Sequence, residues 1–571
     1  MSDLQTETKG SEAAFEYPRA KEKTKVEVLK EESNNLRGTL IEDVVSDAPR
    51  FGNNSELLLK FFGIYQQKDR DRRKAGEPLG EPKPFTLMVR GRIPGGRLTG
   101  EQYLAWDKVA DKYSSNGLRL TTRQSIQIHG VLKGNLKSAV QEVYEALSST
   151  VGACGDVVRN VTQAVNPWGD PKIAQIDGVV NQLSKHFEAE SNAYFEIFLD
   201  GDQVVEEKED PIYGRAYLPR KFKLGVTVAG NNSIDIYTHD LGLVATFDEV
   251  GILDGYHVLV GGGMGMSHGD NATHPRLADD LGWIQADAVI AVSEAIVTTQ
   301  RDHGNREDRT FARLKYLLDK NGLDWFRSEV ERRAEVRFLL RSVPDWKTPR
   351  YLGWNQHSDG SLTLGFHTLS GRIVDSQNTP LKSALRDVIR NFHLHVQVTA
   401  EQDLVLYGIR TEDQKAIEDF LASNGLSGLS PRQVYDRALT CVALPTCIKA
   451  LAEAERVGPE IFGALQESLD RYDLSPRAPV IRITGCPNGC ARPFAAEIGL
   501  VGQAPGQYAV FLGGDEEGLR LAQKVKDKVK ITDLPELFHK LIEIWAREGG
   551  PEERLGDFVN RFGHERIGAA L

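Results

Sequence analysis

Cysteine is the residue whose type and spacing most directly indicate chemistry in this chain. Four of the five cysteines fall in two segments, Cys441/Cys447 with five residues between them and Cys486/Cys490 with three. A disulfide pair requires an oxidising compartment, which nothing else in the sequence indicates. Structural zinc sites use about two to four residues between paired cysteines, whereas iron–sulfur clusters take four thiolates at varied spacing. The spacing therefore favours a [4Fe–4S] cluster and leaves zinc open.

The residues around the four thiols are typical of a cluster-binding loop. Pro445 and Pro487 stiffen the two segments, and Gly485 and Gly489 allow backbone amides to approach sulfur closely. Cys154 is isolated from the other four, and we expect it to be a small core residue.

A second group of chemically capable residues lies on a predicted strand over 117–130. Apolar residues alternate there with side chains that can donate hydrogen bonds, which puts the two kinds on opposite faces. The donors are Arg119, Thr121, Arg123, Gln127 and His129. So many donors on one face predict an anionic ligand along the sheet, although a single arginine on a strand is usually solvated.

Further cations lie elsewhere in the chain. Lys221 and Lys223 share one face of a predicted strand and could form either a solvated edge or an anion clamp. The segment 298–309 combines basic and acidic residues, which either pair with one another or face a ligand.

The two cysteine segments, the second reading Cys-Pro-Asn-Gly-Cys, resemble the signature of the sirohaem-dependent sulfite and nitrite reductases. The resemblance extends from 32–39 to the C-terminal region and is closest in detail to the haemoprotein (beta) subunits of the NADPH-dependent assimilatory enzymes. It implies one [4Fe–4S] cluster per chain, held by Cys441, Cys447, Cys486 and Cys490. It also implies one sirohaem per chain, with Cys490 as the axial ligand that joins its iron to the cluster.

The resemblance also implies roles for the polar residues. Sirohaem carries eight carboxylates, which need cationic or hydrogen-bonding partners. The implied sirohaem contacts are Arg119, Thr121, Thr122, Arg123, Gln127, His129, Arg301, Asn305 and Asn488. The implied catalytic positions, which bind the substrate anion, are Arg90, Arg159, Lys221 and Lys223.

The activity implied by the resemblance is the six-electron reduction of sulfite to sulfide, in sulfate assimilation and cysteine biosynthesis. The electron donor would be an NADPH-dependent flavoprotein (alpha) subunit carrying FAD and FMN. The Gly-rich segment 258–266 does not complete a dinucleotide fingerprint and no P-loop is present, so electrons would come from a partner. A ferredoxin-dependent sulfite or nitrite reductase is an alternative, and so is a zinc-stabilised binding protein without redox chemistry.

The elements that must position these residues predict an α+β fold with an internal duplication. Residues 120–131 align with 398–409, with Thr, Gln and Gly recurring in step and the arginines present in the first copy alone. We therefore expect two ferredoxin-like halves in a pseudo-twofold arrangement, with two α/β domains for sirohaem and the cluster.

The predicted domains follow from this plan. They are an N-terminal extension with a docking arm and a helical segment (1–80), the first ferredoxin-like half (81–150), a sirohaem-binding α/β domain (151–340), the second half (341–425) and a cluster and sirohaem α/β domain (426–571). Within the last domain we expect helices near 516–528 and 533–547.

Composition sets the remaining limits. A net charge of −11 argues against nucleic acid as the main ligand, and no apolar run is long enough to span a membrane. The N-terminal segment lacks the apolar core of a secretory signal and is too acidic for an organellar transit peptide, so we expect a cytoplasmic protein. Composition leaves that segment as either a mobile tail or an arm that docks on a partner.

Overall fold

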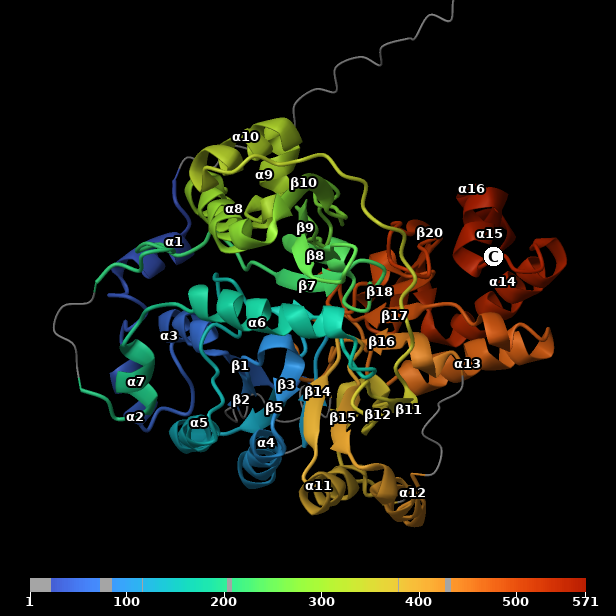
Figure 1. Ribbon diagram of the computed structural model, residues 1–571, viewed down its shortest axis with the longest axis horizontal. Helices are drawn as coiled ribbons and strands as arrows, with labels where there is room; N and C mark the ends of the chain where they lie inside the picture. Colours follow the sequence, from blue (N-terminus) through green and yellow to red (C-terminus); the bar gives the residue numbers. More distant parts are fainter. Residues whose placement is uncertain (1–21, 72–84, 115–116, 203–207, 378, 427–432) are drawn as a thin grey trace, which may run out of the picture.

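The computed structural model describes residues 22–71, 85–114, 117–202, 208–377, 379–426 and 433–571 (Figure 1). Two five-stranded antiparallel sheets form one part of it, with strand orders β1-β2-β5-β4-β13 and β11-β12-β15-β14-β3. The strands of the first sheet are β1 (Ile64–Lys68), β2 (Phe85–Arg90), β4 (Leu118–Leu120), β5 (Ile126–Val131) and β13 (Arg372–Ile373). Those of the second are β3 (Arg97–Leu98), β11 (Gly353–Gln356), β12 (Leu362–Phe366), β14 (His395–Val398) and β15 (Leu404–Ile409).

The two sheets exchange a short strand. β13 comes from the second half of the duplication and pairs with β4, placing Arg372 opposite Arg119. β3 comes from the first half and pairs with β14, placing Arg97 opposite Gln397. The two pairings join equivalent positions of the duplicated unit, so the pseudo-twofold arrangement of two ferredoxin-like halves is confirmed.

Glycine permits this exchange at two equivalent positions. Gly96 and Gly371 have φ values of +73° and +70°, which residues with a side chain rarely adopt. A Cβ atom at Gly96 would lie 2.2 Å from the carbonyl oxygen of Val398, and one at Gly371 would lie 2.4 Å from that of Leu120. Both sites therefore require a residue without a side chain.

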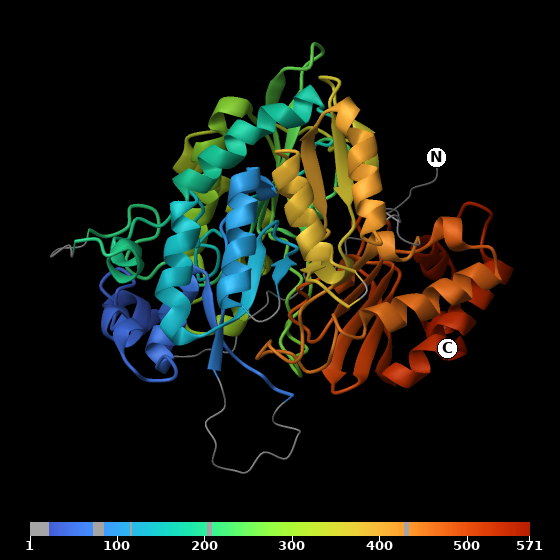
Figure 2. The same ribbon diagram turned by 90° about the horizontal axis from the view of Figure 1, so that it is seen from below.

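Four helices lie side by side across one face of the paired sheets (Figure 2). They are α4 (Gly100–Tyr113), α5 (Leu136–Glu145), α11 (Leu381–Asn391) and α12 (Gln414–Ser423). α4 starts at a capping box, in which the Thr99 hydroxyl accepts from the Gln102 amide and the Gln102 side chain accepts from the Thr99 amide. α4 packs on α11, which joins the two halves through helices as well as strands.

The remaining two sheets have the same mixed pattern, with three parallel strands followed by two antiparallel ones. One contains β6 (Thr162–Gln163), β7 (Leu224–Val228), β8 (Leu241–Phe247), β9 (Leu253–Val260) and β10 (Asp279–Gln285). The other contains β16 (Ala438–Thr440), β17 (Ile481–Thr484), β18 (Ile498–Ala504), β19 (Gln507–Leu512) and β20 (Gln523–Lys530).

Helices flank these two sheets and the N-terminal part of the chain (Figure 1). Those before the first α/β sheet are α1 (Lys25–Glu32), α2 (Leu40–Val45) and α3 (Asn53–Leu59). The first α/β unit has α6 (Pro171–His186), α7 (Ala193–Phe198), α8 (Val289–His303), α9 (Leu314–Asn321) and α10 (Leu323–Ala334). The last unit has α13 (Gly458–Arg471), α14 (Leu534–Glu548), α15 (Leu555–Phe562) and α16 (His564–Ala570).

Several predicted elements differ from the observed ones. The single strand expected over 117–130 is a hairpin of β4 and β5, in which Leu118 pairs with Ile128 and Arg119 with Gln127. The predicted helix near 516–528 is wrong, since no residue of this range is helical and the range ends in β20, which pairs with β19. The helical segment expected within 1–80 contains β1 as well as short helices, and the docking arm expected at its start falls largely on residues 1–21, outside the described part of the chain.

Two large hydrophobic cores hold the molecule together. One extends through the two ferredoxin-like halves and the first α/β unit, whereas the buried residues of the other all lie within 434–571. Among the described helices, none is both long enough and apolar enough to cross a bilayer.

Candidate functional site

Adjacent parallel strands carry the two cysteine segments to one edge of the last sheet. β16 ends at Thr440, directly before Cys441, and β17 ends two residues before Cys486. The strands pair in parallel, so both loops leave the sheet at the same edge. The Cys441 amide donates to the Ile483 carbonyl at 3.1 Å, and the Gly485 amide donates to the Cys441 Sγ at 3.3 Å. The fold thus joins two segments that lie about forty residues apart.

The four thiols influence one another electrostatically. Burial, and then the neighbouring Cys490, raise the pKa of Cys486 to about 12 and raise the pKa of Cys447. Burial raises the pKa of Cys441 as well, with contributions from the other three cysteines. Because each thiolate disfavours the next, all four can ionise together only beside a cationic centre.

The arrangement of the thiols distinguishes between the metal sites left open by their spacing. All five cysteines are free thiols, so the disulfide alternative is wrong. A single zinc ion would require sulfur atoms about 3.8 Å apart, given its short bonds and tetrahedral geometry. Within the described ranges, no three or more His, Cys, Asp or Glu side chains are grouped closely enough to hold one metal ion. A cube of four irons instead takes one thiolate at each of four separate corners.

The β4–β5 hairpin packs directly against the cysteine loops. The Thr122 hydroxyl, in the turn between the strands, donates to the Cys490 carbonyl at 3.1 Å. Arg119 donates to the Thr440 carbonyl at 3.2 Å and pairs with Glu455 at 3.0 Å. The hairpin that carries the predicted donors is therefore fixed to the edge that carries the cysteines.

Beyond the hairpin lies a group of half-buried cations with few carboxylates beside it. Burial, followed by Arg313 and Lys223, lowers the pKa of Lys221 well below its usual range. Burial, with Arg123 and Arg313, lowers the pKa of Lys223 to about 7. Arg123 donates through Nη2 to the Asn160 and Leu224 carbonyls, but its Nε has no hydrogen-bond partner in the described part of the chain. Such an excess of buried positive charge fits a ligand with many carboxylates, as sirohaem is.

Arg90 and Arg159 lie near Tyr65 and Cys154, two residues that the sequence analysis did not assign to the site. Arg90 Nη1 lies 3.0 Å from the Cys154 Sγ, and its guanidinium lies 6.0 Å from the centre of the Tyr65 ring. Arg159 donates to the Gly155 carbonyl at 3.2 and 3.3 Å. Cys154 is buried as expected, but it contacts a site cation. Tyr65 was missed because its segment was expected to be helical, whereas alternation along β1 directs it to the site.

Gln127 and His129 occupy the same sheet. In the orientation that satisfies both groups, the Gln127 side-chain oxygen accepts from Arg90 Nε at 2.8 Å. The His129 Nδ1 lies 3.0 Å from the Gln67 Oε1. Burial and the nearby Arg372 lower the pKa of His129 well below its usual range, so the ring is neutral at neutral pH.

Three other predicted contacts occupy different surroundings. Arg301 pairs with Asp302 at 2.6 Å and donates to the Ile212 carbonyl at 2.7 Å. The Asn305 Oδ1 accepts from the backbone amides of the loop that follows α8. None of these bonds joins Arg301 or Asn305 to the group of cations around Lys221 and Lys223. Asn488 is exposed between the last two cysteines and hydrogen-bonds to Cys486.

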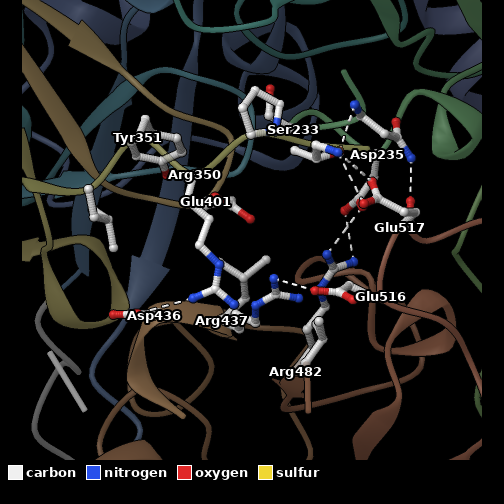
Figure 3. Close-up of a pocket in the computed structure, with 16 residues that line it drawn as sticks. Ser233, Asp235, Arg350, Tyr351, Glu401, Asp436, Arg437, Arg482, Glu516 and Glu517 are labelled. Carbon is white, nitrogen blue, oxygen red and sulfur yellow. Dashed lines mark hydrogen bonds and ion pairs between the residues drawn. The ribbon is translucent and has the colours of Figure 1, made fainter. Parts of the chain in front are cut away.

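The second hairpin, β14–β15, leads to a cavity with different chemistry (Figure 3). Glu401 lies at the position equivalent to Arg123, and its carboxylate points into a cavity of about 160 Å³. The arginines that line the cavity have carboxylate partners: Arg437 pairs with Glu516 at 2.5 Å and Arg482 with Asp235 at 2.7 Å. Five carboxylates and three arginines line this cavity, so it lacks the excess of cations found beyond the first hairpin.

Comparison with known protein families gives two matches. The family described as "Nitrite and sulphite reductase 4Fe-4S domain" matches residues 181–338 and 436–571. The "Nitrite/Sulfite reductase ferredoxin-like half domain" matches residues 81–146 and 355–424, one match in each half of the duplication.

Similar proteins cover nearly the whole chain. Two relatives, from Paenibacillus sp. (strain JDR-2) and Shewanella denitrificans, are each 41% identical over 94% of this chain, and the matches cover 95% and 96% of the relatives. Both are named "Sulfite reductase [NADPH] hemoprotein beta-component". The solved structure of the Mycobacterium tuberculosis NirA protein covers 96% of this chain and 98% of its own, with a TM-score of 0.77 and 19% identity. That likeness shows the fold.

Proposed function

The chain belongs to the nitrite and sulphite reductase family, and we propose that it is the haemoprotein component of an assimilatory sulfite reductase. It reduces sulfite to sulfide with six electrons. Its cofactors are one sirohaem and one [4Fe–4S] cluster. When bound, these groups supply the sulfite-binding iron and the electron transfer that the protein side chains lack.

One observation carries the proposal: the edge that carries the four thiols and the hairpin beside the group of cations are in direct contact. Thr122 connects the hairpin to the Cys490 carbonyl at 3.1 Å, and the hairpin also carries the arginine with an unpartnered Nε. The cluster would be held by Cys441, Cys447, Cys486 and Cys490. The sirohaem carboxylates would be held by the donors of the hairpin, with Asn488 close by.

Four cations beyond the hairpin would bind the substrate oxyanion: Arg90, Arg159, Lys221 and Lys223. They stabilise negative charge on oxygen in surroundings that exclude most water, where such interactions are strongest. Each sulfite oxygen must leave as water and therefore needs protons. Lys223, with a pKa of about 7, can give up a proton and regain it near neutral pH.

The electron donor would be a separate flavoprotein subunit that oxidises NADPH. The names of the relatives include NADPH, whereas no dinucleotide fingerprint is complete in this sequence. Reduced thiols and a low-potential donor suit the cytoplasm, where we place the enzyme.

The decisive experiment measures composition and turnover of the purified chain together. We expect four cluster irons and one sirohaem iron per chain, a haem-like absorption spectrum, and higher kcat/KM with sulfite than with nitrite when a small reductant supplies electrons. Preference for nitrite would instead support a nitrite reductase. A colourless, folded protein that retains zinc would overturn the assignment.

The donor is tested separately, with the wild-type holoprotein. We expect NADPH to support turnover once an FAD- and FMN-containing reductase is added. Turnover with reduced ferredoxin and none with the flavoprotein would show that the chain is ferredoxin-dependent.

A further inference from the structure

Four consecutive backbone carbonyls lie immediately before the segment that carries Lys221 and Lys223, and each accepts a hydrogen bond from a cation. Arg306 donates to Ala216 at 3.4 Å and to Tyr217 at 2.7 Å, Lys30 to Leu218 at 2.7 Å, and Arg309 to Pro219 at 3.3 Å. We call the three cations the carbonyl clamp. Charge-assisted bonds of this kind are stronger than neutral ones, so the segment 216–219 is tightly held.

Two buried carboxylates hold the carbonyl clamp in place. Glu27 accepts from Lys30 at 2.7 Å and also pairs with Arg306. Asp156 pairs with Arg309 at 2.8 Å. Glu27 is 0% exposed and Lys30 is 1% exposed, although both belong to the first helix described in the chain. Charges buried to this degree need well-aligned partners, so α1 is locked against the segment 216–219.

The clamped segment is hydrogen-bonded to the strand-like segment that carries Arg159. The Leu218 amide donates to the Asp156 carbonyl at 3.0 Å, and the Phe222 amide donates to the Val157 carbonyl at 3.0 Å. The Arg159 amide in turn donates to the Phe222 carbonyl at 2.9 Å. Fixing the carbonyls of 216–219 therefore fixes the backbone from which Arg159, Lys221 and Lys223 extend.

We propose that α1 is a positioning element for the oxyanion site, and that Lys30 and Glu27 are positioning residues that act through the segment 216–222. The proposal rests on the proposed function for the identity of the anion, sulfite. Neither residue is assigned a contact with substrate or cofactor. Loosening the clamp should therefore weaken anion binding while leaving electron delivery to the cofactors intact.

The test uses the holoprotein with Lys30→Met, which keeps the length of the side chain and removes its charge. Sulfite binding is followed by the change in sirohaem absorbance, turnover with a small reductant, and backbone opening by amide hydrogen exchange over 216–222. We expect the sulfite Kd and KM to rise at least fivefold, kcat to stay within twofold, and exchange over 216–222 to accelerate at least tenfold.

Arg37→Met is the matched control. Arg37 lies in the same N-terminal segment and forms a similarly buried ion pair at 2.7 Å with Glu196, a residue outside the carbonyl clamp. We expect this variant to lose thermal stability without a change in sulfite Kd. An equal loss of sulfite affinity in both variants would mean that general destabilisation, and not positioning, explains the effect.

Unchanged sulfite Kd and unchanged exchange in a folded Lys30→Met protein would overturn the proposal. If that variant does not fold, Glu27→Gln removes one carboxylate charge with almost no change of shape, and the same comparison applies. Absence of sulfite turnover in the wild-type holoprotein would refute the proposed function instead, while the exchange measurement would still decide whether α1 holds the segment.

Discussion

Lys221 and Lys223 place positive charge in a part of the fold where other cations, and not carboxylates, are the main neighbours. Both lysines are half-buried, and the cations that lower their pKa include Arg313 for both, Arg123 for Lys223, and Lys223 for Lys221. Like charges in a desolvated site destabilise the folded chain. An anionic ligand bound there would offset this cost, which would link the stability of the site to its occupancy.

Replacing Lys221 by methionine should reduce sulfite turnover at least tenfold, a loss of about 1.4 kcal/mol in transition-state stabilisation. The sirohaem spectrum should remain that of the wild type, because the lysine is assigned to the substrate. Steady-state kinetics with a small reductant measure the effect. Lys382→Met is the control, since Lys382 is buried and paired with Asp107 at 2.8 Å in the ferredoxin-like halves. Unchanged turnover in Lys221→Met would remove this lysine from the site.

The lowered pKa of Lys223 predicts how the stability of the cofactor-free chain depends on pH. Its folded pKa of about 7 lies below the ordinary value of 10.5, so between these values the unfolded chain binds more protons and stability rises with pH. Lys223→Met abolishes this dependence. We expect the variant to raise the melting temperature more at pH 6 than at pH 9. An equal shift at both pH values would contradict the lowered pKa.

At the scale of elements, the hairpin turn shows what sequence reasoning could and could not find. The donors were identified from alternation, and pairing across the hairpin keeps Arg119 opposite Gln127. The reversal itself was missed, because Gln124 adopts a φ of +50° without the glycine, proline or asparagine that usually marks a turn. The hydrogen bond from Lys30 to the Leu218 carbonyl could not be predicted from the sequence either, since the two residues lie 188 positions apart.

The cysteine loops were easier to find, because rare residues at short spacing are visible without knowledge of the fold. What the sequence could not supply was the parallel pairing of β16 with β17, which brings the loops to one edge. Arg492 likewise gave no signal, although it donates to the Thr122 carbonyl at 3.3 Å and to the Ala400 carbonyl at 3.1 Å. These are equivalent positions of the two copies, so one arginine joins both hairpin turns.

The exchanged strands give a prediction at the same scale. Gly371→Ala should destabilise the protein by several kcal/mol, because a Cβ atom would lie 2.4 Å from the Leu120 carbonyl oxygen. Gly360→Ala is the control, since its φ of +86° is also unfavourable but its surroundings are open. We expect the control to cost about 1 kcal/mol in denaturant unfolding. Equal losses in both variants would show that backbone strain, not the close approach, sets the cost.

At the scale of the whole molecule, an acidic chain encloses a cationic interior. The net charge is −11, yet arginines and lysines gather beyond the first hairpin and lower one another's pKa. The net negative charge of the chain repels nucleic acids and other polyanions, whereas the local group of cations attracts an anionic ligand that can reach it. The net charge thus bears on large polyanionic partners, whereas the local cations bear on the ligand of the site.

The cofactor-free chain should therefore be stabilised by a small polycarboxylate. We expect citrate to raise its melting temperature above that in sodium chloride of equal ionic strength, because citrate binds the folded state alone. The double variant Lys221→Met/Lys223→Met should lose most of this gain. Equal stabilisation of the double variant by citrate would place the anion elsewhere.

The strands that the two halves lend each other have a consequence for how the protein can be divided. β3 completes the sheet of the later half and β13 that of the earlier half, so neither sheet is whole within its own stretch of chain. A gene divided between the two halves would encode two fragments, and the sheet in each fragment would lack one edge strand. We expect neither fragment to fold when it is produced alone, and we expect co-expression of the two fragments in one cell to restore folding.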